Sequence, residues 1–213
     1  MSSTPFARYA GLAGVVVVAA AAIFAIVHHA GGAAGVAPGH RLPPFAVPLA
    51  LGALHGDANV ATHAHQGSAG SVPACSVRAA EVVNVCQLYE HSPLVLALFV
   101  NGGSCADVLG EMQTVSRSYP GVSFAAVALE GDRGKLKRTL RQRGIKLPVG
   151  IDEDGVLASL YKVFSCPQLD FAYPGGVVQS KAVLGEPTLA QLRTRVGALV
   201  AASRARGWRE PAV

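Results

Sequence analysis

The pattern of apolar and polar positions divides the chain into an apolar amino-terminal run and a longer mixed region. Residues 10–27 are apolar and uncharged, and this length lies near the lower limit of the 17–25 or so residues that cross a bilayer. Arg8 precedes the run, and no Lys or Arg follows it before Arg41. The positive-inside rule therefore predicts a transmembrane anchor with residues 1–9 in the cytoplasm and the remaining chain outside. A cleaved signal peptide and a buried core helix are the alternatives.

The segment after the apolar run is rich in Gly and Ala. Residues 28–41 contain Pro38 and almost no large apolar side chain, which is typical of a flexible linker. We therefore expect one folded domain over residues 42–203, followed by a loose basic tail at residues 204–213. The pattern shows no internal repeat and no second domain.

Within the expected domain, short apolar runs alternate with segments of helical periodicity. Leu94–Val100 and Val122–Leu129 are apolar on both faces, so we predict central strands that are covered on both sides. The other predicted strands are 45–50, 59–62, 147–151, 169–173 and 177–184, with a weaker apolar stretch at 82–88; the predicted helices are 105–118, 131–144, 154–163 and 188–203. Strands that alternate with helices, before a hairpin and a last helix, predict an α/β fold with a mixed sheet.

The composition argues against a disordered chain and against a nucleic-acid-binding protein. The chain has 213 residues, of which 51% are hydrophobic and 15% charged, with a formal net charge of +5. This apolar content excludes disorder along the whole chain. Aromatic residues are only 6%, so little could stack on bases, and no nucleic-acid partner is expected outside the cytoplasm. Four cysteines allow two disulfides in an oxidising compartment.

Two cysteines stand where the predicted elements change. Cys105 follows an apolar strand and a Gly-Gly break, and it is expected to open a helix, where exposure and the helix dipole favour the reactive thiolate. Cys166 precedes Pro167 between a helix and the hairpin, a place where proline is often cis. Each cysteine alone is equally compatible with a small buried side chain.

Together these features resemble the thioredoxin-like superfamily, and within it the membrane-anchored TlpA/ResA-type thiol–disulfide oxidoreductases, or redoxins. That family has an apolar strand, a Cys-x-x-Cys motif and a following Glu-Met, then a cis-Pro loop, a hairpin and a closing helix. The matching segments here are residues 94–100, 105–108, 111–112, 166–167, 169–184 and 188–203. The resemblance implies a three-layer α/β/α domain, preceded by the transmembrane helix, without a cofactor.

The motif itself is degenerate. Val108 stands where the family has its second cysteine, and Ser104 replaces the usual Trp. The resemblance implies that Cys105 is the attacking thiol and that Cys166 lies against it. We expect either a disulfide between them, which needs Cα atoms within about 7 Å, or a resolving thiol at Cys166. Nearby carboxylates at Asp107 and Glu111 would oppose the thiolate and accept protons.

The second cysteine pair precedes the central strand. Cys75 and Cys86 are expected to form a structural disulfide, which would stabilise the fold by roughly 2–3 kcal/mol in the chain-entropy model. The alternative is a second redox pair that exchanges with Cys105.

Other chemistries have weaker support. His55, His63, His65 and the pair 28–29 could suggest copper, but the ligand pattern of thioredoxin-like copper chaperones is missing, so no metal site is expected. The peroxiredoxin pattern of Pro and Thr before the reactive Cys is also missing. The basic run 133–146 is either a solvated helix face or a surface attracted to anionic lipids.

The sequence thus predicts a membrane-tethered, extracytoplasmic, thioredoxin-like protein that exchanges disulfides with protein thiols or disulfides outside the cytoplasm. Cys105, Cys166 and Pro167 would form the redox centre. The loss of Cys-x-x-Cys keeps a second hypothesis open: a non-catalytic thioredoxin-like binding module whose cysteine pairs are both structural.

Overall fold

The protein is represented by a computed structural model, which describes residues 34–210. The predicted anchor at residues 10–27 and the predicted cytoplasmic segment 1–9 lie outside the described residues. Within residues 34–210, no helix is both long and apolar enough to cross a membrane.

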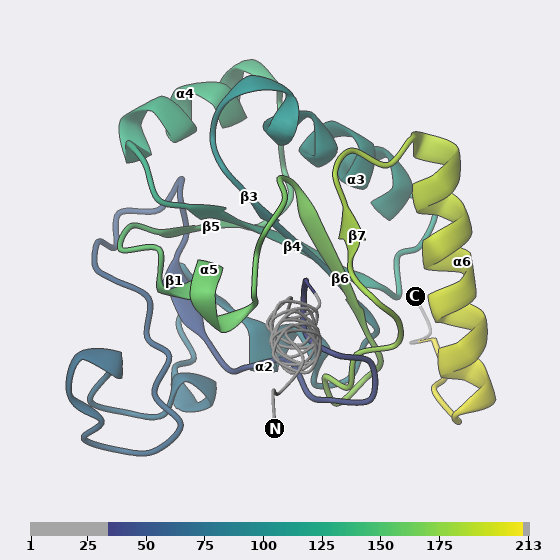
Figure 1. Ribbon diagram of the computed structural model, residues 1–213, viewed down its shortest axis with the longest axis horizontal. Helices are drawn as coiled ribbons and strands as arrows, with labels where there is room; N and C mark the ends of the chain where they lie inside the picture. Colours follow the sequence, from purple (N-terminus) through teal and green to yellow (C-terminus); the bar gives the residue numbers. More distant parts are fainter. Residues whose placement is uncertain (1–33, 211–213) are drawn as a thin grey trace, which may run out of the picture. The chain divides into compact units, whose positions relative to one another are not determined.

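A five-stranded mixed sheet in the order β5-β4-β3-β6-β7 forms the centre of the domain (Figure 1). Its strands are β3 (Leu94–Phe99), β4 (Ser123–Leu129), β5 (Val149–Asp152), β6 (Gln168–Ala172) and β7 (Val183–Leu184). β3, β4 and β5 are parallel, whereas β6 runs antiparallel to β3 and β7 antiparallel to β6. The predicted α/β class and mixed sheet are confirmed.

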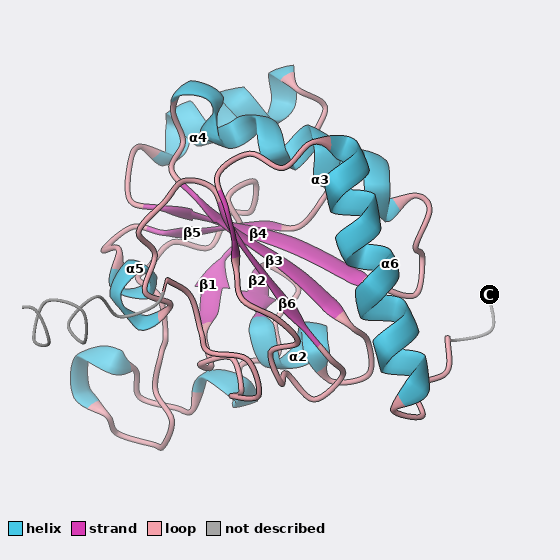
Figure 2. Cartoon of the chain, turned by 45° about the vertical axis from the view of Figure 1, so that its right-hand side comes forward, coloured by secondary structure: helices cyan, strands magenta, loops and turns pink. Residues whose placement is uncertain are grey.

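Helices cover both faces of this sheet (Figure 2). One face carries α3 (Val108–Ser116), α4 (Arg133–Gln142) and α6 (Leu189–Ala205); the other carries α2 (Val85–Tyr89), α5 (Val156–Leu160) and a ribbon of β1 (Ala46–Pro48) with β2 (Val82–Asn84). Three short 3₁₀ helices complete the elements: η1 (Gly67–Ala69), η2 (Ala74–Ser76) and η3 (Gly103–Asp107). The domain therefore has three layers.

β3 lies between the two apolar cores and contributes side chains to both. Its six residues are all fully buried, and their side chains alternate between the two apolar clusters on opposite faces of the sheet. This alternation explains why the strand is apolar at every position, and it confirms the sequence-based prediction of a covered central strand.

Local polar contacts decide where several elements begin. The Thr188 hydroxyl accepts the Gln191 N–H while the Gln191 side chain accepts the Thr188 N–H, a capping box that starts α6 at the beginning of the predicted helix 188–203. The apolar stretch 82–88 divides into β2 and α2, because the Asn84 side chain caps the helix at Cys86 and Gln87.

Three elements differ from the prediction. The expected strand 59–62 is a single bridge between Asn59 and Ala46. The helix expected from Cys105 starts as η3, and α3 itself begins only at Val108. The second hairpin strand is reduced to β7, since the chain pairs with β6 through isolated contacts near Val178 before reaching it.

The segment predicted as a linker over residues 28–41 is not free where it is described. Gly35 donates its N–H to the Lys162 carbonyl at 3.1 Å, and Gly39 donates to the Val178 carbonyl at 2.9 Å. Residues 34–41 therefore form a strap on the domain surface, held by backbone hydrogen bonds that a Gly-rich composition does not reveal.

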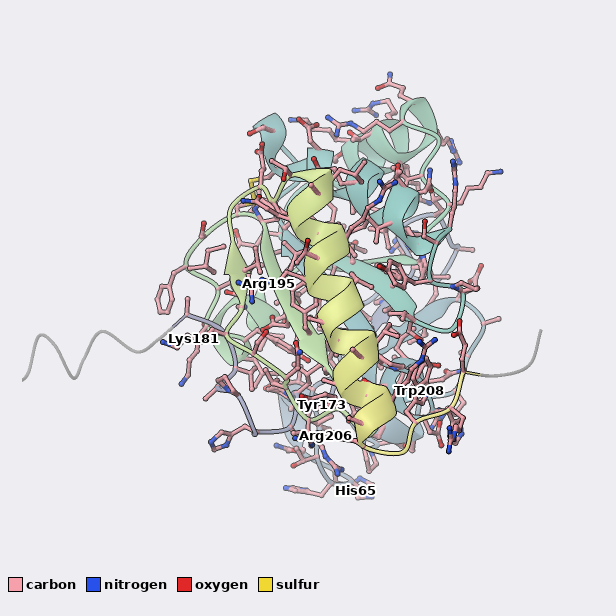
Figure 3. The ribbon with its side chains drawn as sticks, turned by 90° about the vertical axis from the view of Figure 1, so that its right-hand side faces the viewer. His65, Tyr173, Lys181, Arg195, Arg206 and Trp208 are labelled. Carbon is pink, nitrogen blue, oxygen red and sulfur yellow. A yellow bond between two sulfur atoms is a disulfide. The ribbon has the colours of Figure 1, made fainter. Side chains whose placement is uncertain are left out.

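The tail predicted to be loose is also tied down as far as residue 210. The Arg206 guanidinium lies 4.0 Å from the centre of the Tyr173 ring (Figure 3), within the range of a cation–π contact. The Trp208 indole N–H donates to the His91 carbonyl at 3.0 Å, and Arg204 pairs with Glu210 at 2.8 Å. The single Trp thus closes the end of the core under α6.

Candidate redox site

Cys105 and Cys166 form a disulfide in the structure. They are 61 positions apart in sequence, and their Cα atoms are 5.5 Å apart, within the range that a disulfide allows. Cys105 lies in η3, after β3, and Cys166 lies in the loop between α5 and β6. The Cys166–Pro167 peptide bond is cis.

The pairing register of β3 with β6 brings the two cysteines together. Leu98 faces Gln168 in the ladder, so the same antiparallel register continued for two residues sets Val100 opposite Cys166. At this point the Val100 N–H donates to Sγ of Cys166 at 3.1 Å. The chain then turns through Gly103, whose φ of +56° favours glycine, and η3 places Cys105 over the loop.

The loop that carries Cys166 is held from its other side as well. The carbonyl of Pro167 accepts the Gly185 N–H at 2.8 Å, so the residues after β7 support the cis-proline. Backbone N–H groups just beyond β3 and β7 therefore hold the loop that carries this sulfur.

Val108 occupies the place where the second cysteine of a Cys-x-x-Cys motif would stand. Its side chain is 1% exposed and packs in the same apolar cluster as Ala106 and Met112. This position contributes to the core, and the only sulfur joined to Cys105 belongs to Cys166.

The expectation that Cys105 opens a helix is wrong in detail. It lies within the 3₁₀ turn, three residues before α3 begins, because Gly102 and Gly103 let the chain tighten there. The 3₁₀ turn runs directly into α3, and the amide donor found at the site points to Cys166.

An apolar hollow of about 250 Å³ opens beside the disulfide. It is lined by Val100, Leu129, Glu130, Ala158, Val163, Phe164, Ser165 and Cys166. Phe164 is 72% exposed and Val100 is 50% exposed, so both offer apolar surface to an incoming molecule. A sulfur next to an open apolar hollow can meet a protein segment rather than only a small thiol.

The helical segment that carries Cys105 of the Cys105–Cys166 disulfide also carries two acidic side chains, Asp107 and Glu111. Glu111 on α3 is half-buried, and one of its carboxylate oxygens is buried without a hydrogen-bond partner. Desolvation, and then the nearby charges of Glu186 and Asp107, raise the pKa of Glu111 above its usual value. Asp107 itself pairs with Arg143.

Cys75 and Cys86 form the other disulfide, with Cα atoms 5.3 Å apart. Asn84 lies between the elements that carry them: its side-chain amide donates to the carbonyls of Ala74 and Val77, and its oxygen accepts the Cys86 N–H. The bond and this network fasten η2 to α2 on the face of the sheet opposite α3.

The histidines do not converge. His55, His63 and His65 are exposed in loops, and residues 34–210 contain no group of three or more His, Cys, Asp or Glu side chains arranged to hold a metal ion. His28 and His29 lie outside the described residues.

Sequence reasoning missed three residues of the site: Val100, Phe164 and Glu186. Val100 could have been found by extending the pairing of the predicted strands 94–100 and 169–173 as far as Cys166, since its contact with that sulfur depends only on the register. Phe164 carries a weaker signal, because an aromatic side chain two residues before Cys166 reads equally well as a core residue. Nothing local marks Glu186, which follows β7 and raises the pKa of Glu111 through its charge.

Comparison with known proteins supports the fold. No protein-family model and no curated protein matches the sequence. A Chlorobium tepidum protein assigned as the thiol:disulfide interchange protein DsbE matches with a TM-score of 0.58 and 18% identity, over 79% of this chain and 98% of that one. The thioredoxin domain of a thiol-disulfide oxidoreductase from Bacteroides vulgatus matches with a TM-score of 0.54 and 13% identity, over 78% of this chain and 99% of that one.

DsbF of Mycobacterium tuberculosis, whose structure contains mixed oxidized and reduced forms, matches with a TM-score of 0.50 and 24% identity over 55% of this chain and 87% of that one. The described domain therefore has the thioredoxin-like fold that the motif resemblance implied.

Proposed function

We propose that this chain is a thiol–disulfide oxidoreductase whose redox centre is the Cys105–Cys166 pair, with protein thiols or disulfides as its substrates. The observation that carries the proposal is the pairing itself. A cysteine on η3 meets a cysteine before a cis-proline, one sulfur accepts a backbone N–H, and the pair borders an open apolar hollow.

The two sulfurs have different roles in this proposal. In the oxidising direction, the thiolate of a partner attacks Sγ of Cys105, the Cys105–Cys166 bond breaks, and Cys166 leaves as a thiolate that the Val100 N–H stabilises. A second thiolate of the partner then attacks the partner's sulfur in the mixed disulfide, and Cys105 leaves as a thiolate. The partner loses two electrons and two protons, and the pair becomes a dithiol.

The reducing direction is the reverse. Cys105 attacks a partner disulfide, and Cys166 then attacks Sγ of Cys105 to release the partner as a dithiol. Cys166 thus acts as the resolving thiol that Val108 cannot supply.

The location is part of the same proposal. The apolar run 10–27 and its charge asymmetry favour a single-pass anchor with the domain outside the cytoplasm. Two disulfides in a domain of this size fit an oxidising compartment.

Trapping with single cysteine variants tests the roles. Cys166→Ser should accumulate mixed disulfides with extracytoplasmic proteins, because the resolving thiol is missing, and thiol-reversible adducts should appear on non-reducing gels. Cys105→Ser is the matched control and should trap at least tenfold less. Equal trapping by the two variants, or none by either, would contradict these roles.

The second candidate is a binding module with structural disulfides, which the buried Val108 favours. It predicts that the Cys105–Cys166 bond stays closed under conditions that reduce exchange proteins. Partners would then bind the apolar hollow without covalent trapping.

A further inference from the structure

The outward side of α4 carries cations without acids. At 100° per residue, Lys135, Arg138 and Arg141 share the arc opposite the buried Leu136 and Leu140. Lys146, which follows the helix, is exposed as well. Within residues 34–210, none of these four cations pairs with a carboxylate. We call these four cations the cationic face.

Three acids on α4 or on the segments beside it have other partners. Asp132 caps α4 by accepting the Lys135 N–H, and Glu153 lies 3.7 Å from the mostly buried Arg133. Glu81 accepts the N–H groups of Ala53 and Leu54. Their contacts are to backbone N–H groups or to Arg133, and none of these three carboxylates forms an ion pair with a cation of the cationic face.

A loop with two exposed leucines packs beside the same helix. Arg133 donates to the Leu49 carbonyl at 2.6 Å, and the Lys137 ammonium donates to the Gly52 carbonyl at 3.1 Å. The loop thereby holds Leu51 and Leu54 at 45% and 43% exposure. Cations beside exposed leucines are the pattern of a surface that rests in a lipid interface.

Below the loop, an apolar hollow of about 310 Å³ continues this surface. Leucine side chains from the loop, from α4 and from the segment before β5 line it, and Lys146 stands among them. An apolar recess with a cation in its wall is suited to a molecule that has an acyl portion and an acidic headgroup.

From these features we propose that the cationic face and the loop 49–54 dock on a bilayer surface rich in anionic phospholipids. The charges attract the headgroups, and Leu51 and Leu54 enter the interface. This inference goes beyond disulfide exchange. The proposed tether would favour docking, because residues 28–33 can span at most about 22 Å and would keep the domain close to the bilayer.

Docking has a consequence for the redox site. Arg143, directly after α4, pairs with Asp107 of η3, so the end of the docking surface lies beside the turn that carries Cys105. The docked domain would present its disulfide close to the membrane, where thiols of membrane proteins emerge.

The test uses the full chain with an environment-sensitive fluorophore at Leu54→Cys, with Ala198→Cys on the exposed side of α6 as the matched control. Selective labelling is feasible because the native cysteines are paired. In vesicles of phosphatidylcholine with 30% or so phosphatidylglycerol, emission from the Leu54 probe should shift to the blue and rise at least twofold relative to phosphatidylcholine alone, whereas the Ala198 probe should not change. About 0.5 M salt should reverse the rise.

The combined variant Lys135→Gln, Arg138→Gln and Arg141→Gln should lose the response. A Leu54 signal equal in both lipids, or one that survives neutralisation of the three cations, would overturn docking. The proposed tether is tested separately: without it, the chain would not float with phosphatidylcholine vesicles. If the redox proposal fails, neither the probe fluorescence nor the vesicle flotation changes.

Discussion

The backbone N–H of Val100 donates a hydrogen bond to Sγ of Cys166 at 3.1 Å. In the reduced protein the same donor would face a thiolate, and a hydrogen bond to an ionised group is stronger than one to a neutral group. The register of β3 with β6 places this donor, so the central strand that builds the core would also tune the reactivity of Cys166 in its proposed role as the resolving cysteine.

Replacing Val100 by proline tests this donor, because proline lacks the N–H. Val100→Pro should raise the pKa of the Cys166 thiol by about one to two units, since a charged hydrogen bond contributes roughly 1.5–3 kcal/mol and one pKa unit corresponds to about 1.4 kcal/mol. The measurement is the pH dependence of alkylation of Cys166 in reduced protein. Val100→Ala keeps the donor and should leave the pKa near that of the parent; the same rise in both variants would refute the role of the N–H.

Phe164 should control the encounter with protein partners. With 72% of the residue exposed beside the disulfide, Phe164→Ser should slow exchange with a folded protein substrate about three- to tenfold, because apolar contact area is lost. The rate with dithiothreitol should stay the same. Val72→Ser, an exposed apolar residue that does not line this hollow, is the matched control. A slower reaction with dithiothreitol would show that the variant damages the site itself.

The Cys75–Cys86 bond should act on stability alone. Cys75→Ala with Cys86→Ala should lower the free energy of unfolding by about 2–3 kcal/mol, since the denatured chain gains freedom. Urea unfolding measures this loss, and the potential of the Cys105–Cys166 pair should remain unchanged. A shift of that potential would instead favour the alternative that the two pairs exchange.

Asp170 should make stability depend on pH. Burial raises the pKa of this β6 carboxyl to about 6, although hydrogen bonds from Gln168 and the Val36 N–H oppose the rise. The folded state therefore holds its proton more tightly than the unfolded state, whose pKa stays near 3.8. Asp170 therefore contributes most to the free energy of unfolding below pH 3.8, and this contribution is lost as the pH rises through about 6.

Urea unfolding at pH 4.5 or so and about pH 7.5 measures this linkage. Asp170→Asn cannot titrate, so the parent should lose about 1–3 kcal/mol relative to the variant between the two pH values. Parallel pH curves for the two proteins would contradict the assignment.

The sequence was most informative where burial is complete. β3 and β4 could be predicted from apolar runs, and α6 from its periodicity with a Thr at its start. The cysteine before Pro167 and the one after the Gly-Gly break could be paired by resemblance to a known family. These signals are strong because a single physical requirement, such as burial on two faces, fixes each residue type.

The remaining features depend on contacts between distant segments. The strap 34–41 is held by backbone hydrogen bonds, which any sequence can make, and its Gly-rich composition resembles a free linker. Trp208 reaches the core only because α6 ends beside His91. The start of η3, before α3, depends on how the Gly-Gly turn meets the cis-proline loop, and local periodicity does not contain that information.

The reduction potential of the Cys105–Cys166 pair tests the central claim most directly. The full chain would be equilibrated across a series of glutathione or dithiothreitol ratios, and mass spectrometry after thiol labelling would follow each cysteine. An exchange protein should show this pair opening reversibly between about −270 and −120 mV, the range of known exchange proteins, while Cys75–Cys86 stays closed. A Cys105–Cys166 bond that resists reduction until below about −300 mV would contradict the account and identify a structural disulfide.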